Sequence, residues 1–152
     1  MKKLLILSIL LAACGGGSTA TETASTESTE STGSETPAFA MVSVDAVAAG
    51  IAPDAAPRLA VFDANSRETF DAGHVPGATW VHYDSVTAEI LPTDPAAPVV
   101  FYCANEGCGA SHTAAETAVS LGHTNVAVMG AGIEGWRAAG QPVEAAAPAP
   151  VE

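Results

Sequence analysis

Between Val99 and Ser111 the chain reads VVFYCANEGCGAS. Its first four residues are β-branched or aromatic, which predicts a short buried strand at 99–102. Two glycines then break the pattern, and an alanine-rich helical stretch begins at Ser111. The segment therefore predicts a strand that ends at Cys103, a loop, and the N-terminus of a helix.

The same alternation continues on both sides of this segment. Helices are predicted at 44–50, 66–70, 111–121 and 133–139, and strands at 58–62, 79–83, 99–102 and 125–129. Ser43 and Ser66 are the expected N-caps of the first two helices, and Gly122 is the expected end of the third. The third helix has an apolar stripe made of Ala114, Ala115, Ala118, Val119 and Leu121.

Strands that alternate with helices and are apolar throughout are typical of parallel sheets. We therefore predict an α/β fold with a small, mainly parallel sheet and helices on both faces. In such folds ligands bind beyond the carboxyl ends of the strands, where Cys103 is expected to lie.

Residues 1–13 are predicted to be a signal peptide. Two lysines precede an apolar run, Leu4 to Leu11, that is much shorter than the ~20 residues that cross a bilayer. The sequence LAAC at 11–14 resembles the lipobox of bacterial lipoproteins. That resemblance implies a lipid such as palmitate on Cys14 and a place in the bacterial cell envelope. We expect the periplasmic side, or the outer membrane where there are two membranes, since Gly15 follows the cysteine.

Three further segments follow from composition. Residues 14–38 are rich in Ser, Thr, Gly and Glu and are predicted to be a disordered tether. Residues 39–144 form the predicted domain, and 145–152 form an Ala/Pro-rich tail.

The charge of the chain is strongly acidic. Cleavage before Cys14 leaves three arginines against all 17 acidic residues, a net charge of −14. Such a surface repels phosphate backbones, so nucleic acid is not an expected partner. We expect a soluble, monomeric domain held at the membrane only through Cys14.

The Cys103 loop has a specific chemical capacity. Free N–H groups of the loop and of the helix N-terminus stabilise a thiolate, which is the nucleophilic form of cysteine. The same groups can hold an anionic ligand. Position alone is equally consistent with a buried, inert cysteine.

Residues 42–144 resemble the rhodanese homology domain. The stretches 61–63 and 68–70, with Gly-His-Val-Pro-Gly-Ala at 73–78, match its first strand, helix and loop. Val99–Cys103 matches the strand that carries its catalytic cysteine, with Ser111 in the helix behind. The final match is 122–136, which includes Gly132-Ile133-Glu134-Gly135-Trp136.

The resemblance implies a sulfurtransferase. Cys103 would take a sulfur from a small donor as a persulfide and pass it to a thiol acceptor, with no cofactor. The substrate-binding loop would comprise Ala104, Asn105, Glu106, Gly107, Cys108 and Gly109. Asp63, Arg67, His74 and Ser111 are the expected supporting residues, with Asp63 and His74 in structural roles.

Two departures bear on this function. Ala104 replaces the arginine that usually follows the catalytic cysteine, and no arginine occurs between Cys103 and Ser111. Thiosulfate should therefore bind poorly, because a charge-assisted pair is worth about 1.5–3 kcal/mol. The rival interpretation is a rhodanese-fold module that binds a small anion or a protein without turnover.

The second departure is Cys108. It is interpreted either as a resolving thiol, which would make the protein a thiol-disulfide redox protein, or as a spectator. A metal site formed with Cys103 and His112 or His74 is a third alternative. The spacing matches no standard zinc pattern, so we predict no metal.

Overall fold

The computed structural model describes residues 38–145. The predictions for residues 1–37 and 146–152, including the lipid on Cys14, lie outside that range. Within it, no helix has the length and apolar character needed to cross a bilayer. The elements are β1 (Ala40–Met41), α1 (Val44–Gly50), β2 (Ala60–Asp63), α2 (Arg67–Ala72), β3 (Thr79–Trp80), β4 (Val99–Tyr102), α3 (Ala110–Ser120), β5 (Val126–Val128) and α4 (Gly132–Ala138).

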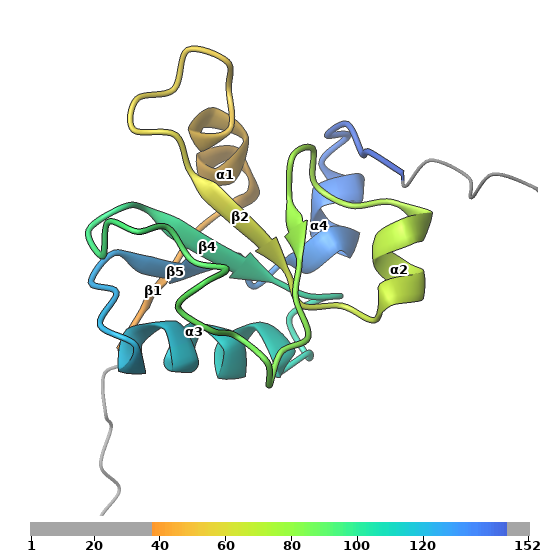
Figure 1. The fold of residues 1–152 in the computed structure, drawn as a ribbon. Coiled ribbons are helices and arrows are strands. Elements are labelled where there is room, and N and C mark those ends of the chain that lie inside the picture. The colour runs from red at the N-terminus through yellow and green to blue at the C-terminus, as the bar shows by residue number, and fades with distance from the viewer. Residues whose placement is uncertain (1–37, 146–152) are drawn as a thin grey trace, which may run out of the picture. The chain divides into compact units, whose positions relative to one another are not determined.

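The five strands form one parallel sheet in the order β1-β5-β4-β2-β3. β4 lies at its centre, and its register places Tyr102 beside Asp63 of β2. Helix α3 covers one face of the sheet, and α1 and α4 cover the other (Figure 1). The predicted α/β fold with a parallel sheet between helices is confirmed.

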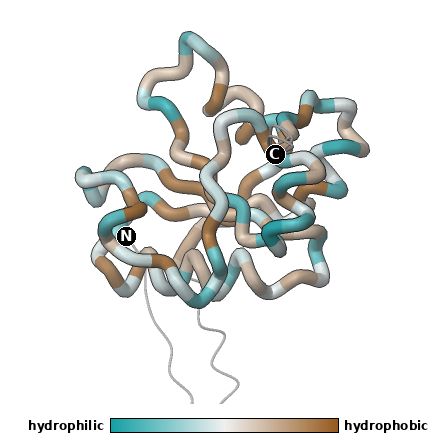
Figure 2. Tube along the Cα trace, turned by 45° about the vertical axis from the view of Figure 1, so that its right-hand side comes forward, coloured by the Kyte–Doolittle hydropathy of each residue, from teal (hydrophilic) through white to brown (hydrophobic). Residues whose placement is uncertain are grey.

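Side chains of β4 alternate between two hydrophobic cores. Val99, Phe101 and Cys103 pack into the core under α3, whereas Val100 and Tyr102 pack into the core under α1 and α4. This alternation follows from the two-residue period of a strand. Hydrophobic residues accordingly concentrate along the central strands (Figure 2).

A buried hydrogen-bond bridge joins the carboxyl ends of β2 and β4. The Tyr102 hydroxyl donates to Asp63 Oδ2 at 2.6 Å and accepts from the backbone N–H of Val75 at 3.0 Å. Asp63 Oδ1 also accepts from the backbone N–H of Asn65 at 2.8 Å. The bridge therefore holds together two strand ends and the loop at 73–78.

Element boundaries differ from the prediction in three informative places. The strand predicted at 79–83 ends at Trp80, because His82 turns out of the sheet and its carbonyl accepts from Ser85. Leu59 bonds to the carbonyl of Gly50 instead of joining the strand predicted at 58–62. Leu121, assigned to the apolar stripe of α3, is 45% exposed because the helix ends before it.

The predicted helix caps are confirmed. Ser43 Oγ accepts from the N–H of Ala46, and Ser66 Oγ accepts from the N–H of Thr69, both at 3.2 Å. Gly122 has a φ of 98° after α3, a conformation that glycine adopts without the penalty of a Cβ. The strand β1 was not predicted, because two residues are too few to show a period.

Candidate functional site

Cys103 follows β4 directly and is almost fully buried, with 1% of its surface exposed. Its sulfur lies 3.0 Å from the carbonyl oxygen of Cys108 and 3.2 Å from Ser111 Oγ. The structure thus brings Cys103, Cys108 and Ser111 together, as the sequence predicts. Both cysteines are free thiols.

The first turn of α4 fixes the start of the Cys103 loop. The N–H of Ile133 donates to the carbonyl of Cys103 at 2.9 Å, and the N–H of Glu134 donates to that of Ala104 at 3.0 Å. Gly132 precedes them with a φ of 60°, and a Cβ there would lie 2.4 Å from the carbonyl carbon and oxygen of Ala104. Only a glycine allows this close approach.

Asn105 shapes the rest of the loop. Its Oδ1 accepts from the N–H of Gly107 at 3.1 Å, and its carbonyl accepts from the N–H of Cys108 at 3.0 Å. Its Nδ2 donates to Glu134 Oε2 at 3.1 Å. Asn105 therefore ties the turn to α4 and sets the position of Cys108.

The two thiols have opposite electrostatic environments. Burial, followed by the hydrogen bond that it donates to Cys108, raises the pKa of Cys103. Partial burial opposes ionisation of Cys108, yet the adjacent Cys103 side chain and the amides of Ala104 and Ala110 lower its pKa. The sequence predicts a stabilised thiolate at Cys103; in the structure burial raises the pKa of that thiol, and the thiol with the lowered pKa is Cys108.

Two hollows flank the loop. The Cys108 pocket has a volume of about 280 Å³ and is lined by Ala64, Asn65, Ser66, His82, Tyr83, Cys108 and Ala110. The acidic hollow is more open and is lined by Asn105, Glu106, Gly107, Ala131, Glu134, Gly135 and Ala138. Cys108 lines the Cys108 pocket, and neither cysteine of the described domain lines the acidic hollow.

None of the three arginines of the described domain lines the hollows beside the Cys103 loop. The Arg67 guanidinium lies over the rings of Phe70 and Trp80 and pairs with Asp71. Arg137 donates to the carbonyl of Gly73 at 2.9 Å, and neither it nor Arg58 lines the hollows beside the loop. Within residues 38–145 no cationic Arg or Lys side chain therefore faces a ligand beside Cys108.

The four predicted supporting residues differ in whether they lie close to the two thiols. Asp63 belongs to the hydrogen-bond bridge described above, where burial raises its pKa and hydrogen bonds from Tyr102 and Asn65 oppose the rise. His74 Nδ1 bonds to the carbonyl of Phe70 at 2.9 Å, and the two rings stack at 3.7 Å. The structure does not bring Arg67 or His74 to the thiols, whereas Ser111 contacts Cys103 directly.

The alternative metal set is not assembled. His112 packs against Phe39, with ring centroids 5.6 Å apart, rather than joining the two cysteines. No group of three His, Cys, Asp or Glu side chains with metal-binding geometry occurs between residues 38 and 145.

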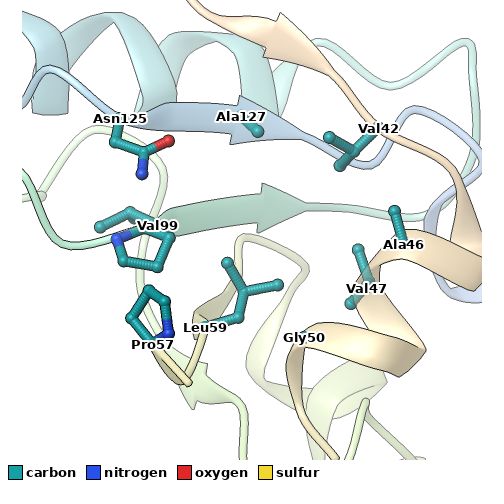
Figure 3. Close-up of a pocket in the computed structure, with 10 residues that line it drawn as sticks. Val42, Ala46, Val47, Gly50, Pro57, Leu59, Val99, Asn125 and Ala127 are labelled. Atoms are coloured by element: carbon teal, nitrogen blue, oxygen red, sulfur yellow. The ribbon is translucent and has the colours of Figure 1, made fainter. Parts of the chain in front are cut away.

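Another cavity of about 280 Å³ lies beneath α1, towards the amino ends of β4 and β5 (Figure 3). Its lining is almost wholly aliphatic and includes Val42, Val47, Leu59 and Val99. It has no nucleophilic or ionisable side chain among its lining residues, so it offers no chemistry comparable to that of the thiols.

The chain was compared with known proteins. The sequence model of the Rhodanese-like domain family matches residues 44–139. The chain belongs to this family. No curated protein matches it. The matched region includes the Cys103 loop and the turn at Gly132, so the glycine contact described above is part of the rhodanese-like domain.

Solved structures show the same fold. The BH2092 protein of Bacillus halodurans superposes with a TM-score of 0.61 at 21% identity, covering 70% of this chain and 77% of that one. A thiosulfate sulfurtransferase of Pseudomonas aeruginosa gives 0.58 at 25% identity, covering 70% of this chain and 20% of the enzyme. A Rhodopseudomonas palustris protein, described as a possible tyrosine phosphatase, gives 0.54 at 28% identity, with 70% and 85% covered.

Several residues of the site carry contacts that the sequence did not predict. One example is the hydrogen bond that the Tyr102 hydroxyl accepts from Val75. Others are the close approach of Gly132 to the Ala104 carbonyl, and the places of His82 and Tyr83 in the lining of the Cys108 pocket. A tyrosine at the end of a strand, one position before the cysteine, was a usable signal, because a buried hydroxyl needs a partner.

The Gly132 contact yields a stability prediction. Gly132→Ala should cost about 2 kcal/mol or more of unfolding free energy, because the new Cβ meets loop backbone at a left-handed φ. Gly109→Ala is the matched control: it has a φ of −80° and open space around it, so a change within ~0.5 kcal/mol is expected. Urea unfolding measures both, and equal losses would contradict this role for Gly132.

The two thiols should also ionise in a definite order. Cys108 should react with iodoacetamide below pH ~8.5, the ordinary thiol value, whereas Cys103 should react only above it. Protonation of Cys108 as the pH falls should therefore abolish labelling of the native protein. Peptide mass mapping across pH measures each thiol, and prior labelling of Cys103 would contradict the assignment.

Proposed function

We propose that this protein is a sulfurtransferase that carries a sulfur atom as a persulfide on Cys103 and passes it to a small thiol acceptor. The main support for this proposal is a free cysteine at the carboxyl end of the central strand, within the region that matches the rhodanese-like domain family. Ser111 Oγ lies 3.2 Å from the sulfur of Cys103, and a hydroxyl at that distance can donate to an anionic persulfide.

The donor of this reaction is proposed to be a hydropersulfide rather than thiosulfate. Thiosulfate carries two negative charges, whereas the site is bordered by Glu106 and Glu134 and has no arginine. Phosphatase chemistry is disfavoured for the same reason, since a phosphate also needs a cation in the loop.

Intact mass after incubation with each donor tests this function. The hydropersulfide of cysteine should add the mass of one sulfur atom, and thiosulfate should add little. Ala104→Arg should improve thiosulfate loading about ten-fold to 100-fold, the equivalent of one charge-assisted pair at about 1.5–3 kcal/mol.

The control for that variant is Ala49→Arg, which places the same charge on the exposed surface of α1. It should leave thiosulfate loading unchanged. If no hydropersulfide sulfur is retained by the wild-type protein, the proposed function is wrong; efficient thiosulfate loading of the wild type would refute only the choice of donor.

We also propose that the domain is tethered to a membrane of the bacterial envelope through lipid on Cys14. Support comes from the basic start, the short apolar run and the LAAC sequence at 11–14. Mass spectrometry of the protein from bacterial membranes should find acyl chains on Cys14. An unacylated N-terminus there would reject the anchor without affecting the chemistry of the domain.

A further inference from the structure

Cys108, not Cys103, faces the space in which a donor can bind. Cys108 is half-buried and lines the Cys108 pocket, together with Ser66, His82 and Tyr83. Cys103 lies behind it with 1% of its surface exposed and lines neither hollow beside the loop. A donor entering the pocket therefore meets the sulfur of Cys108 first.

The hydrogen bonds around Cys108 suit a nucleophile. The S–H of Cys103 donates to the carbonyl oxygen of Cys108 at 3.0 Å. Partial burial opposes ionisation of Cys108, but the polar surroundings of its sulfur, which include the amides of Ala104 and Ala110, lower the pKa of its thiol overall. These surroundings favour the thiolate at Cys108, whereas burial raises the pKa of Cys103 and favours its protonated form.

We propose that Cys108 is the entry thiol of a two-cysteine relay, which takes sulfur from a donor in the Cys108 pocket and hands it inward to Cys103. This inference rests on the proposed function, because it assumes that the site carries a persulfide. It adds a second catalytic residue and a direction of transfer.

Both steps balance without an external oxidant or reductant. In the first, the Cys108 thiolate attacks the outer sulfur of a hydropersulfide, the sulfur–sulfur bond of the donor breaks, and the donor leaves as a thiolate. In the second, Cys103 attacks that same outer sulfur as its proton moves to Cys108. The bond at Cys108 breaks, a persulfide remains on Cys103, and Cys108 becomes a thiol again.

The pocket favours a small, weakly charged donor. Asn65 and Ser66 contribute uncharged polar side chains to its wall. The wall also includes His82, whose Nδ1 is hydrogen-bonded to Asp84. The side-chain amide nitrogen of Asn65 is buried beside the Asp63 carboxylate, but within the described domain it donates no hydrogen bond of acceptable geometry. With Tyr83 as an aromatic wall, this lining suits a low-molecular-weight hydropersulfide better than an oxyanion.

Variants of the full chain in which one of the two domain cysteines is replaced test the relay. Each is incubated with the hydropersulfide of cysteine, quenched with iodoacetamide over time, and the added sulfur is located by tandem mass spectrometry. Cys103→Ser should retain the sulfur on Cys108. Cys108→Ser and Cys108→Ala should load Cys103 about ten-fold more slowly or worse, because a buried thiol with a raised pKa must then attack alone.

A further control separates proximity from exposure. Ser120→Cys, made in the Cys108→Ser background, places an exposed thiol at the far end of α3 and should not restore loading of Cys103. Restoration would overturn the relay, since any surface thiol would then suffice.

The remaining outcomes distinguish the relay from the function on which it rests. Loading of Cys103 at the wild-type rate in Cys108→Ser would overturn the relay and keep the sulfurtransferase. A Cys103–Cys108 disulfide with release of sulfide would also overturn it, because Cys103 would have attacked the inner sulfur. Absence of added sulfur from the wild type and from both single variants would remove the function itself.

Discussion

Two backbone hydrogen bonds from the start of α4 decide where the chain goes after β4. The N–H groups of Ile133 and Glu134 hold the carbonyls of Cys103 and Ala104, so the loop cannot leave the sheet in another direction. Asn105 and Cys108 are then positioned by short-range bonds within the turn. Segments thirty residues apart in the sequence therefore form one rigid unit around the two sulfurs.

The Asp63–Tyr102 bridge stabilises the same edge of the sheet through buried side-chain hydrogen bonds. Burial raises the pKa of the Asp63 carboxyl, and the Tyr102 hydroxyl and neighbouring groups compensate part of that cost. The pKa of Tyr102 is raised as well, first by burial and then by the Asp63 charge, so the hydroxyl remains a donor. The neutral hydroxyl of Tyr102, hydrogen-bonded to the buried Asp63 carboxyl, thus connects β2, β4 and the 73–78 loop without an arginine.

The sequence predicted the elements well where local signals were strong. Capping serines, apolar strands and terminal glycines gave most boundaries within one or two residues. It did not predict that Val86 and Leu91, in the irregular segment between β3 and β4, enter the core under α3. That segment shows no period, and the burial of its side chains depends on contacts with distant parts of the chain.

The sequence predicted that the members of the candidate site lie together, but not how burial and pKa differ between its two thiols. Cys103, Cys108 and Ser111 could be placed together because strand, loop and helix N-terminus are adjacent in sequence. The position of Cys108 depends on the turn that Asn105 makes, and that turn has no unambiguous signature. Full burial of one thiol and partial burial of the other likewise follow only from packing against the sheet.

The alanine face of α3 has a consequence for how the domain can change. Ala114, Ala115 and Ala118 are fully buried against the sheet, and they leave no room for a longer side chain. The spacing between helix and sheet also sets the distance from Ser111 to the sulfur of Cys103. A longer side chain at one of these alanines would push the helix away from the sheet and change the surroundings of the Cys103 thiol, which belongs to the same core. The packing of the hydrophobic interior and the reactivity of the site therefore cannot evolve independently.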